Sequence, residues 1–224
     1  NEPQFWKIMA EDYAQLAKAG YIADKLADPE CNVMLSDMNV IKAPVLSMNT
    51  GKFCDSIAAH IYGFYVPYFW GIIGKMRSLN GWKAAAGIPD KPVWLTEIGV
   101  CTYTHMHTIP VRSLNEVRRY QAVHIPKSMA GSMAFGASKI LNYNYQDVPV
   151  EAREEEFGVI DRYGQPKPAA MSYRTTARLL GNARFAGFIK GHSVAPGKIA
   201  VRDNRVCYRA GCRCCLRWTP WCAS

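Results

Sequence analysis

A short apolar run that ends in a carboxylate, Val93-Trp94-Leu95-Thr96-Glu97-Ile98-Gly99, restricts the folds open to this chain more than any other segment. The run follows Pro92 directly and its apolar part is too short for a helix, so it predicts a buried strand. Strands that are apolar on both faces are typical of parallel sheets covered by helices. We therefore expect Glu97 at the carboxyl end of a parallel strand, where Gly99 turns the chain away.

Similar apolar runs alternate with helical patterns along the first 182 residues. Further strands are predicted at 33–35, 56–63 and 139–145, and helices at 8–27, 44–48, 69–86, 113–135 and 169–180. Ser113 and Glu116 form a candidate capping box for the fourth helix, which Pro126 could kink. The alternation predicts an α/β fold built of βα units around a parallel sheet. A doubly wound nucleotide-binding sheet is disfavoured, because no glycine-rich loop follows any of these strands.

The pattern changes after residue 182. Short strands are expected at 185–189, 198–201 and 206–208, so the chain divides into a main body at 1–182 and a small β-rich appendage at 183–224. The appendage has eight Lys and Arg residues against one acid, whereas the net charge of the whole chain is +9. A basic segment can bind nucleic acid or an anionic membrane, but we expect a solvated surface with neither partner. No apolar run approaches the roughly 20 residues of a membrane span.

The eight cysteines fall into two groups. Three are scattered through the main body and are expected to be buried: Cys31, Cys54 and Cys101. Five crowd the end of the chain: Cys207, Cys212, Cys214, Cys215 and Cys222. Zinc binding, disulfides and an altered reading frame could each account for the second group. We favour an altered reading frame, because a strand pattern begins at Val206 and does not continue after Tyr208. A zinc site from Cys101, His105 and His107 lacks an evident fourth ligand, so we expect no metal.

Two glutamates suggest the chemistry. Glu2 lies in Asn1-Glu2-Pro3, 95 residues before Glu97, and one βα unit takes roughly 30 residues, so the two are about three units apart. Two carboxyl groups at the same rim of a sheet suit the cleavage of a glycosidic bond. One donates a proton to the departing oxygen, and the other, ionised, attacks the sugar carbon.

Three segments resemble the motifs of retaining glycoside hydrolases with a TIM barrel (clan A). Asn1-Glu2-Pro3 and Thr96-Glu97-Ile98-Gly99 resemble the signatures that end strands four and seven of that barrel, and residues 59–63 resemble the motif of strand six. The trailing strands resemble the small β-sandwich of the β-xylosidase-like branch, family 39, although a cellulase-like relative fits the barrel motifs too. The resemblance implies the C-terminal half of a (β/α)8 TIM barrel, about strands four to eight, followed by a small β-rich appendage.

The resemblance also implies roles for individual residues. Glu2 would be the general acid/base, Glu97 the nucleophile of a double displacement, and Asn1 a hydrogen-bond donor to the sugar 2-hydroxyl. Tyr62 would donate a hydrogen bond to Glu97, and His60 would line the sugar site.

This sequence departs from the family where strand eight often supplies a tryptophan platform for the sugar. Residues 142–145 stand there as Asn-Tyr-Asn-Tyr, and Asn144 is our candidate substrate-binding residue in that segment. The implied substrate is an oligosaccharide, a polysaccharide or another glycoside, and no cofactor is expected.

Two other functions remain open from the sequence. A protein of the same fold could bind a glycan without cleaving it, and the basic tail alone would suggest a nucleic-acid-binding protein. Because the chain starts at Asn1 without Met, we expect the N-terminal half of the barrel to be missing. A half barrel has two unpaired strand edges and should self-associate. From the substrate class we favour a secreted or periplasmic location.

Overall fold

The computed structural model describes residues 2, 7–36, 42–62, 68–102, 113–148, 156–188 and 206–209. For residues 42, 68–70, 187–188 and 206–209 it describes the backbone alone. Several predictions lie outside the described residues: those on Asn1, His105, His107, the 198–201 strand and the cysteines from Cys212 onward.

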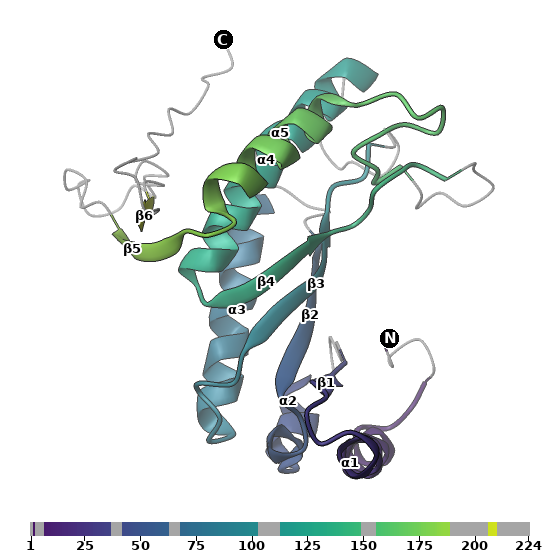
Figure 1. Ribbon diagram of the computed structural model, residues 1–224, viewed down its shortest axis with the longest axis vertical. Coiled ribbons are helices and arrows are strands. Elements are labelled where there is room, and N and C mark those ends of the chain that lie inside the picture. Colours follow the sequence, from purple (N-terminus) through teal and green to yellow (C-terminus); the bar gives the residue numbers. More distant parts are fainter. Residues whose placement is uncertain are drawn as a thin grey trace.

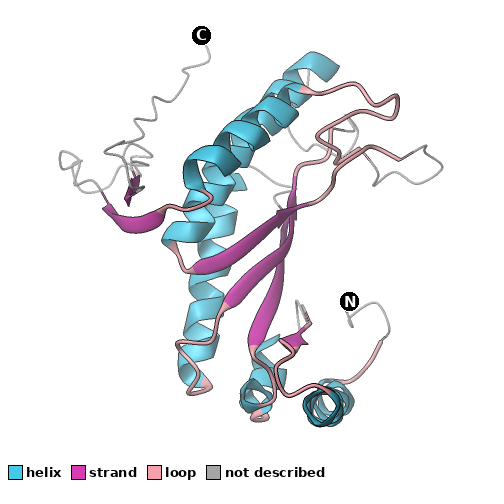
Figure 2. Ribbon diagram, in the orientation of Figure 1, coloured by secondary structure: helices cyan, strands magenta, loops and turns pink. Residues whose placement is uncertain are grey.

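A sheet of four parallel strands forms the centre of the main body, as the sequence predicted (Figures 1 and 2). The strands are neighbours in chain order: β1 (Met34–Leu35), β2 (Ser56–Tyr62), β3 (Val93–Gly99) and β4 (Ala137–Asn142). The helices are α1 (Ala10–Ala27), α2 (Lys42–Ser47), α3 (Tyr68–Ala85), α4 (Leu114–Ala134) and α5 (Pro168–Leu180), with a short 3-10 helix at Thr50–Lys52. Sequential parallel strands joined by helices are the arrangement expected of consecutive βα units.

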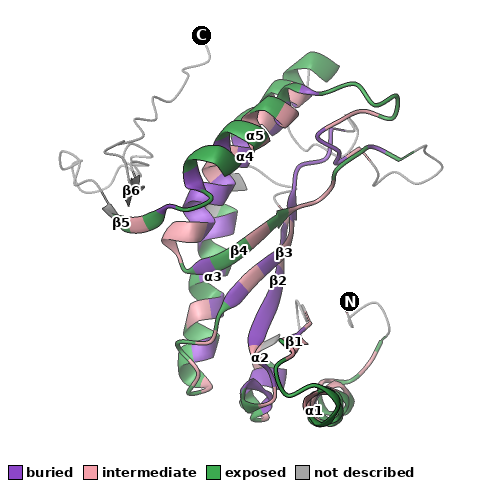
Figure 3. Cartoon of the chain, viewed as in Figure 1, coloured by how far each residue is buried: buried purple, intermediate pink, exposed green. Residues whose placement is uncertain are grey.

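The main hydrophobic core lies between the helices and one face of this sheet (Figure 3). Alternate residues of β2 and β3 and one side of α3 are almost fully buried there: Ile57, Ala59, Ile61, Val93, Leu95, Ile98, Ile72, Met76 and Leu79. Side chains alternate between the two faces of a strand. The opposite face of the sheet is therefore the one left for functional side chains.

An irregularity in the pairing of β2 with β3 decides the direction of Glu97. Ala59 pairs with Leu95, but the next pair is His60 with Glu97, so Thr96 is an extra residue in β3. Regular alternation would place Glu97 on the same face as Leu95, in the core. The extra residue instead turns Glu97 to the face that carries His60, as bulges often do beside active sites.

The helix boundaries follow the predicted ones closely. Ser113 caps α4, since the Glu116 backbone N–H donates to Ser113 Oγ at 3.3 Å. The helix continues through Pro126. The last strand of the sheet differs more: it was predicted at 139–145, but β4 ends at Asn142 and the polar residues after it form a loop.

The cysteine prediction for the main body is correct at two of three positions. Cys54 and Cys101 are buried, whereas Cys31 is partly exposed. Burial raises the pKa of the Cys54 thiol to about 11, so this thiol stays protonated at neutral pH.

Two strands after α5 form a separate small sheet. β5 (Arg184–Phe188) pairs antiparallel with β6 (Val206–Arg209), in agreement with two of the three strands predicted there. Across the described segments, no helix has the length and apolar character needed to cross a membrane.

His124 on α4 should make the stability of the fold depend on pH. The residue is 4% exposed, and burial lowers its pKa to about 4. The unfolded chain takes up a proton near pH 6.5, before the folded chain does, so stability falls as the pH drops from about 6.5 to about 4. The loss attributable to this side chain is about 3 kcal/mol. Urea titrations at pH 7 and pH 4.5 measure it, and His124→Gln should flatten that part of the profile. Identical pH profiles for the two proteins would contradict the assignment.

Both edges of the sheet are unpaired among the described residues. β1 and β4 each have one strand neighbour, and Leu141 on β4 is 47% exposed. Open edges pair with other chains, so we expect this chain by itself to self-associate. Sedimentation velocity should show species above the monomer mass of 25.1 kDa, and Leu141→Lys should reduce them. A clean monomer over a wide concentration range would contradict this expectation.

Candidate active site

Four of the predicted site residues meet at the carboxyl ends of β2 and β3. His60 Nδ1 lies 2.9 Å from Glu2 Oε1 and 3.2 Å from Glu97 Oε2. The Tyr62 hydroxyl donates to Glu97 Oε2 at 2.5 Å. His60 and Tyr62, two residues apart on β2, therefore point to the same side, and the sheet brings both of them to Glu97.

The His60 ring links the two carboxylates. In the tautomer with a proton on Nδ1, this nitrogen can donate a hydrogen bond toward both carboxylates. The His60 side chain is 5% exposed, whereas the side chains of Glu2 and Glu97 are 24% and 21% exposed. The carboxylates are thus fixed from the protein side and remain open to a ligand from the solvent side.

The same three residues are a potential set of metal ligands. One carboxylate oxygen each from Glu2 and Glu97 and one His60 nitrogen all lie within 4.8 Å of one another. Two carboxylates and an imidazole suit a divalent cation. A proton on His60 Nδ1 would account for the same short distances, so the geometry alone does not select a metal ion.

Tyr62 is a neutral hydrogen-bond donor in an aromatic cluster. Burial, together with the hydrogen bond to Glu97, raises the pKa of its phenol far above the ordinary value. The Tyr62 ring centroid lies 5.4 Å from that of Phe157 and 5.9 Å from that of Tyr143, with edge-to-face geometry in both pairs. Tyr143 directly follows β4, and Phe157 lies in the loop before α5.

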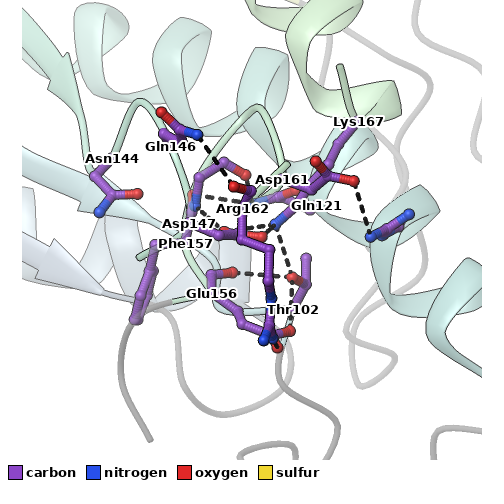
Figure 4. A network of polar contacts seen from close by, with 12 residues as sticks. Thr102, Gln121, Asn144, Gln146, Asp147, Glu156, Phe157, Asp161, Arg162 and Lys167 are labelled. Carbon is purple, nitrogen blue, oxygen red and sulfur yellow. Dashed lines mark hydrogen bonds and ion pairs between the residues drawn. The ribbon is translucent and has the colours of Figure 1, made fainter. Parts of the chain in front are cut away.

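Asn144 lies beside this cluster but supports the loop after β4 (Figure 4). Its backbone N–H donates to the Phe157 carbonyl, and its own carbonyl accepts from Val159 N and Asn142 Nδ2, each at 3.3 Å. Its Oδ1 is buried and has no hydrogen-bond partner among the described residues. The sequence singled out Asn144 in this segment, whereas the neighbouring Tyr143 is the residue that contacts Tyr62.

A buried polar network ties together the loops at this rim of the sheet (Figure 4). Lys167 Nζ lies 2.5 Å and 2.7 Å from the two carboxylate oxygens of Asp147 and donates to Thr102 Oγ1 at 3.0 Å. Thr102 donates from N and Oγ1 to the Glu156 carbonyl, at 2.8 and 2.9 Å. Burial lowers the pKa of Lys167 and Asp147 opposes that shift. The network joins the segments after β3 and β4 to the one before α5.

An open hollow lies at the other rim of the sheet. It has a volume of about 600 Å³ and is lined by the end of α3, residues 89–92 and the turn between α4 and β4. Because it lies at the amino ends of β3 and β4, it is separate from the carboxylates. Active sites of α/β barrels lie at the carboxyl ends of the strands, which favours the rim with Glu97.

Comparison with known proteins identifies the fold. No family model matches the sequence, and no curated protein matches it. The chain resembles the solved structure of a family 39 glycoside hydrolase from Bacteroides cellulosilyticus WH2, with 20% identity, a TM-score of 0.64, and coverage of 85% of this chain and 42% of that one. It also resembles a family 39 β-xylosidase from Caulobacter crescentus, with 19% identity, a TM-score of 0.53 and coverage of 72% and 36%. A third similar structure is a family 2 β-galacturonidase from Eisenbergiella tayi, with 19% identity, a TM-score of 0.57 and coverage of 79% and 32%.

These similarities confirm the predicted fold. The four-stranded parallel sheet and its helices have the fold of part of the TIM barrel, similar to that of these family 39 and family 2 structures, as the motif resemblance implied. The chain spans about two fifths or less of the length of those structures. At identities of 20% and below, the likeness concerns the fold, so the function has to be argued from the site.

Proposed function

We propose that this chain carries the catalytic rim of a glycoside hydrolase that cleaves O-glycosidic bonds with retention. Glu97 is the nucleophile and Glu2 the general acid/base. The observation that supports this most is the arrangement of His60 between the two carboxylates, with Tyr62 donating to Glu97. Because of this arrangement the two carboxyl groups have different surroundings, as their different roles in the reaction require.

The proposed reaction has two steps. Glu97 attacks the anomeric carbon while the bond from that carbon to the leaving oxygen breaks, and Glu2 gives its proton to that oxygen. Glu2 then takes a proton from a water molecule, whose oxygen attacks the anomeric carbon and releases the Glu97 carboxylate. Hydrogen bonds from Tyr62 and His60 stabilise the negative charge on Glu97 before attack and again when it leaves.

The two carboxylates lie close enough to act on one glycosidic bond. Retaining enzymes place the two carboxyl groups about 5–5.5 Å apart, whereas inverting enzymes leave about 6.5–9.5 Å for a water molecule between them. Oxygen atoms of Glu2 and Glu97 lie within 4.8 Å of each other, both in contact with one ring nitrogen. Both carboxylates contact the same ring nitrogen and can therefore face one bond, which supports the proposal that Glu97 attacks directly.

The proposed substrate is a glycoside, oligosaccharide or polysaccharide, bound in a complete barrel. The four described parallel strands form an open sheet, so we propose that further strands close the barrel and complete the sugar site. Asn1 would contact the sugar 2-hydroxyl beside Glu2. We propose no cofactor, and a secreted or periplasmic location suits an enzyme with such substrates.

The substitution Glu2→Gln tests the acid role through its dependence on the leaving group. A poor leaving group needs the proton from Glu2, so kcat/KM of the complete barrel should fall about 10³-fold with an alkyl glycoside. An activated aryl glycoside leaves without a proton and should lose about tenfold or less in its bond-breaking step. Pre-steady-state release of the aryl group measures that step.

The matched control is Glu11→Gln, at an exposed position of α1, which should change neither rate. Equal losses with both leaving groups would contradict the role of Glu2 as the acid. Glycan binding without turnover in the unsubstituted protein would favour the alternative of a non-catalytic carbohydrate-binding protein.

A further inference from the structure

We propose that Phe157 is a positioning residue for the nucleophile: its ring sets the direction of the Tyr62 hydroxyl, which in turn fixes Glu97. The inference rests on the proposed function, because it assigns Phe157 a part in the work of Glu97. It adds a residue from the loop before α5, which has no contact of its own with the reacting atoms in the proposed mechanism.

The rings of Phe157, Tyr62 and Tyr143 form one edge-to-face cluster. Phe157 is 3% exposed, and its ring meets Tyr62 and Tyr143 with both centroid distances at 5.4 Å and interplanar angles of 69° and 68°. Tyr62 and Tyr143 meet each other at 5.9 Å and 85°. Each ring thus contacts the other two, and such edge-to-face contacts have a preferred orientation. A Cβ added at Gly99 would lie 3.2 Å from Phe157 Cδ1, so β3 leaves the ring little room.

Hydrogen bonds fix the backbone on both sides of Phe157. The Glu156 carbonyl accepts two hydrogen bonds from Thr102. The Gly158 N–H donates to Asp147 Oδ1 at 2.8 Å, and Asp147 is paired with the buried Lys167. The polar network of Figure 4 therefore holds the residues directly before and after Phe157.

A third attachment comes from α4. Gln121 is 1% exposed, and its Nε2 lies 3.0, 3.1 and 3.2 Å from the carbonyls of Val100, Phe157 and Gly158. One amide group thus joins the segment after β3 to the Phe157 backbone. A side chain on a backbone held in this way is a fixed support, because neither neighbouring segment moves independently.

Loss of the Phe157 ring would weaken the short hydrogen bond from Tyr62 to Glu97. The Tyr62 hydroxyl lies at the end of a rigid ring, so a tilt of that ring moves the hydroxyl away from Glu97 Oε2, to which it donates at 2.5 Å. A side chain at position 157 that is smaller or lacks an aromatic ring removes the edge-to-face contact and allows the Tyr62 ring to tilt. Tyr62 would then donate less well, and Glu97 would be a poorer leaving group in the second step.

Nitration of Tyr62 by tetranitromethane tests the inference on this chain itself. The reagent attacks the phenolate, so a buried phenol that donates to a carboxylate reacts slowly. In Phe157→Leu we expect Tyr62 to be nitrated about tenfold faster, since the phenol becomes more accessible and easier to ionise. Mass spectrometry of the peptide that contains Tyr62 measures the rate. Phe157→Met, whose unbranched and flexible side chain adapts more readily to the space left by the ring, provides a second variant in case the leucine variant is poorly folded.

The matched control is Phe135→Leu. Phe135 ends α4, its ring lies 5.1 Å from the Arg77 guanidinium carbon, and it lines the hollow at the opposite rim. This variant loses a ring of the same size and should leave nitration of Tyr62 unchanged. In the complete barrel, with a substrate for which the second step limits, Phe157→Leu should also lower kcat and KM together by about tenfold, with kcat/KM changed by less than about twofold, because only the release of Glu97 is slowed.

The outcomes separate this inference from the proposed function. Unchanged nitration of Tyr62 in both Phe157 variants overturns the inference, even if Glu97 proves to be the nucleophile. Equal acceleration in Phe135→Leu overturns it as well, because the effect would then be general loosening. Faster nitration in the Phe157 variants alone supports the positioning of Tyr62, and this result does not require the chain to hydrolyse any glycoside.

Discussion

Glu97→Gln is expected to abolish glycoside hydrolysis in the complete barrel, with kcat/KM reduced by about 10⁴-fold or more. An amide oxygen is too weak a nucleophile to attack the anomeric carbon. The amide also removes the negative charge to which Tyr62 donates and which lies 3.2 Å from His60 Nδ1. Unlike Glu2→Gln, this loss should not depend on the leaving group, because the attack by residue 97 is required for every substrate. Initial rates with alkyl and aryl glycosides measure it.

The control for this prediction is Glu30→Gln, which neutralises an exposed carboxylate in the loop after α1. It should retain the full rate. A thermal melt of Glu97→Gln close to that of the unsubstituted protein would show that the loss is chemical. Hydrolysis of both glycosides at rates near the original ones would mean that the nucleophile is another residue.

The largest expected effect on stability comes from Lys167→Met. The side chains of Lys167 and Asp147 are 1% and 6% exposed, so removal of the cation leaves a buried carboxylate without its partner. Breaking a buried ion pair from one side costs about 3–5 kcal/mol. Equilibrium unfolding in urea measures the change, and the double variant Lys167→Met/Asp147→Leu should recover part of it because no unpaired charge remains.

A surface pair provides the comparison for that variant. Arg162 lies 3.3 Å from Glu156, with side chains 40% and 19% exposed, and Arg162→Met should cost less than about 1 kcal/mol. Equal losses for the two methionine variants would contradict the view that burial makes the Lys167–Asp147 pair important.

The sequence predicts the strand order and the bounds of β3 because apolar runs and turn residues are local signals. Strand β3 has the predicted ends, Val93 and Gly99. The extra residue at Thr96 was not predictable, because it arises from the pairing of β3 with β2 and leaves no mark on the pattern of β3 itself. Yet that residue is the reason why Glu97 faces His60 and not the core.

The site residues, like the strands, were predictable from the sequence only in part. Glu2, Glu97, His60 and Tyr62 were predicted because they lie in short motifs at strand ends, and the structure brings them together. Tyr143 and Phe157 were missed. The position of Tyr143 directly after the last strand was a usable signal, but Phe157 lies in a loop with no pattern of its own. The backbone around Phe157 is held by contacts between segments far apart in the chain, such as the hydrogen bond from Lys167 to Thr102, 65 residues away.

The stereochemistry of hydrolysis tests the central claim most directly. Proton NMR during hydrolysis by the complete barrel follows the first sugar released, before its two anomers interconvert. The double displacement through Glu97 predicts that this sugar has the same anomeric configuration as the substrate. A first product of the opposite configuration would mean that water attacks the substrate directly, and Glu97 would not be a nucleophile.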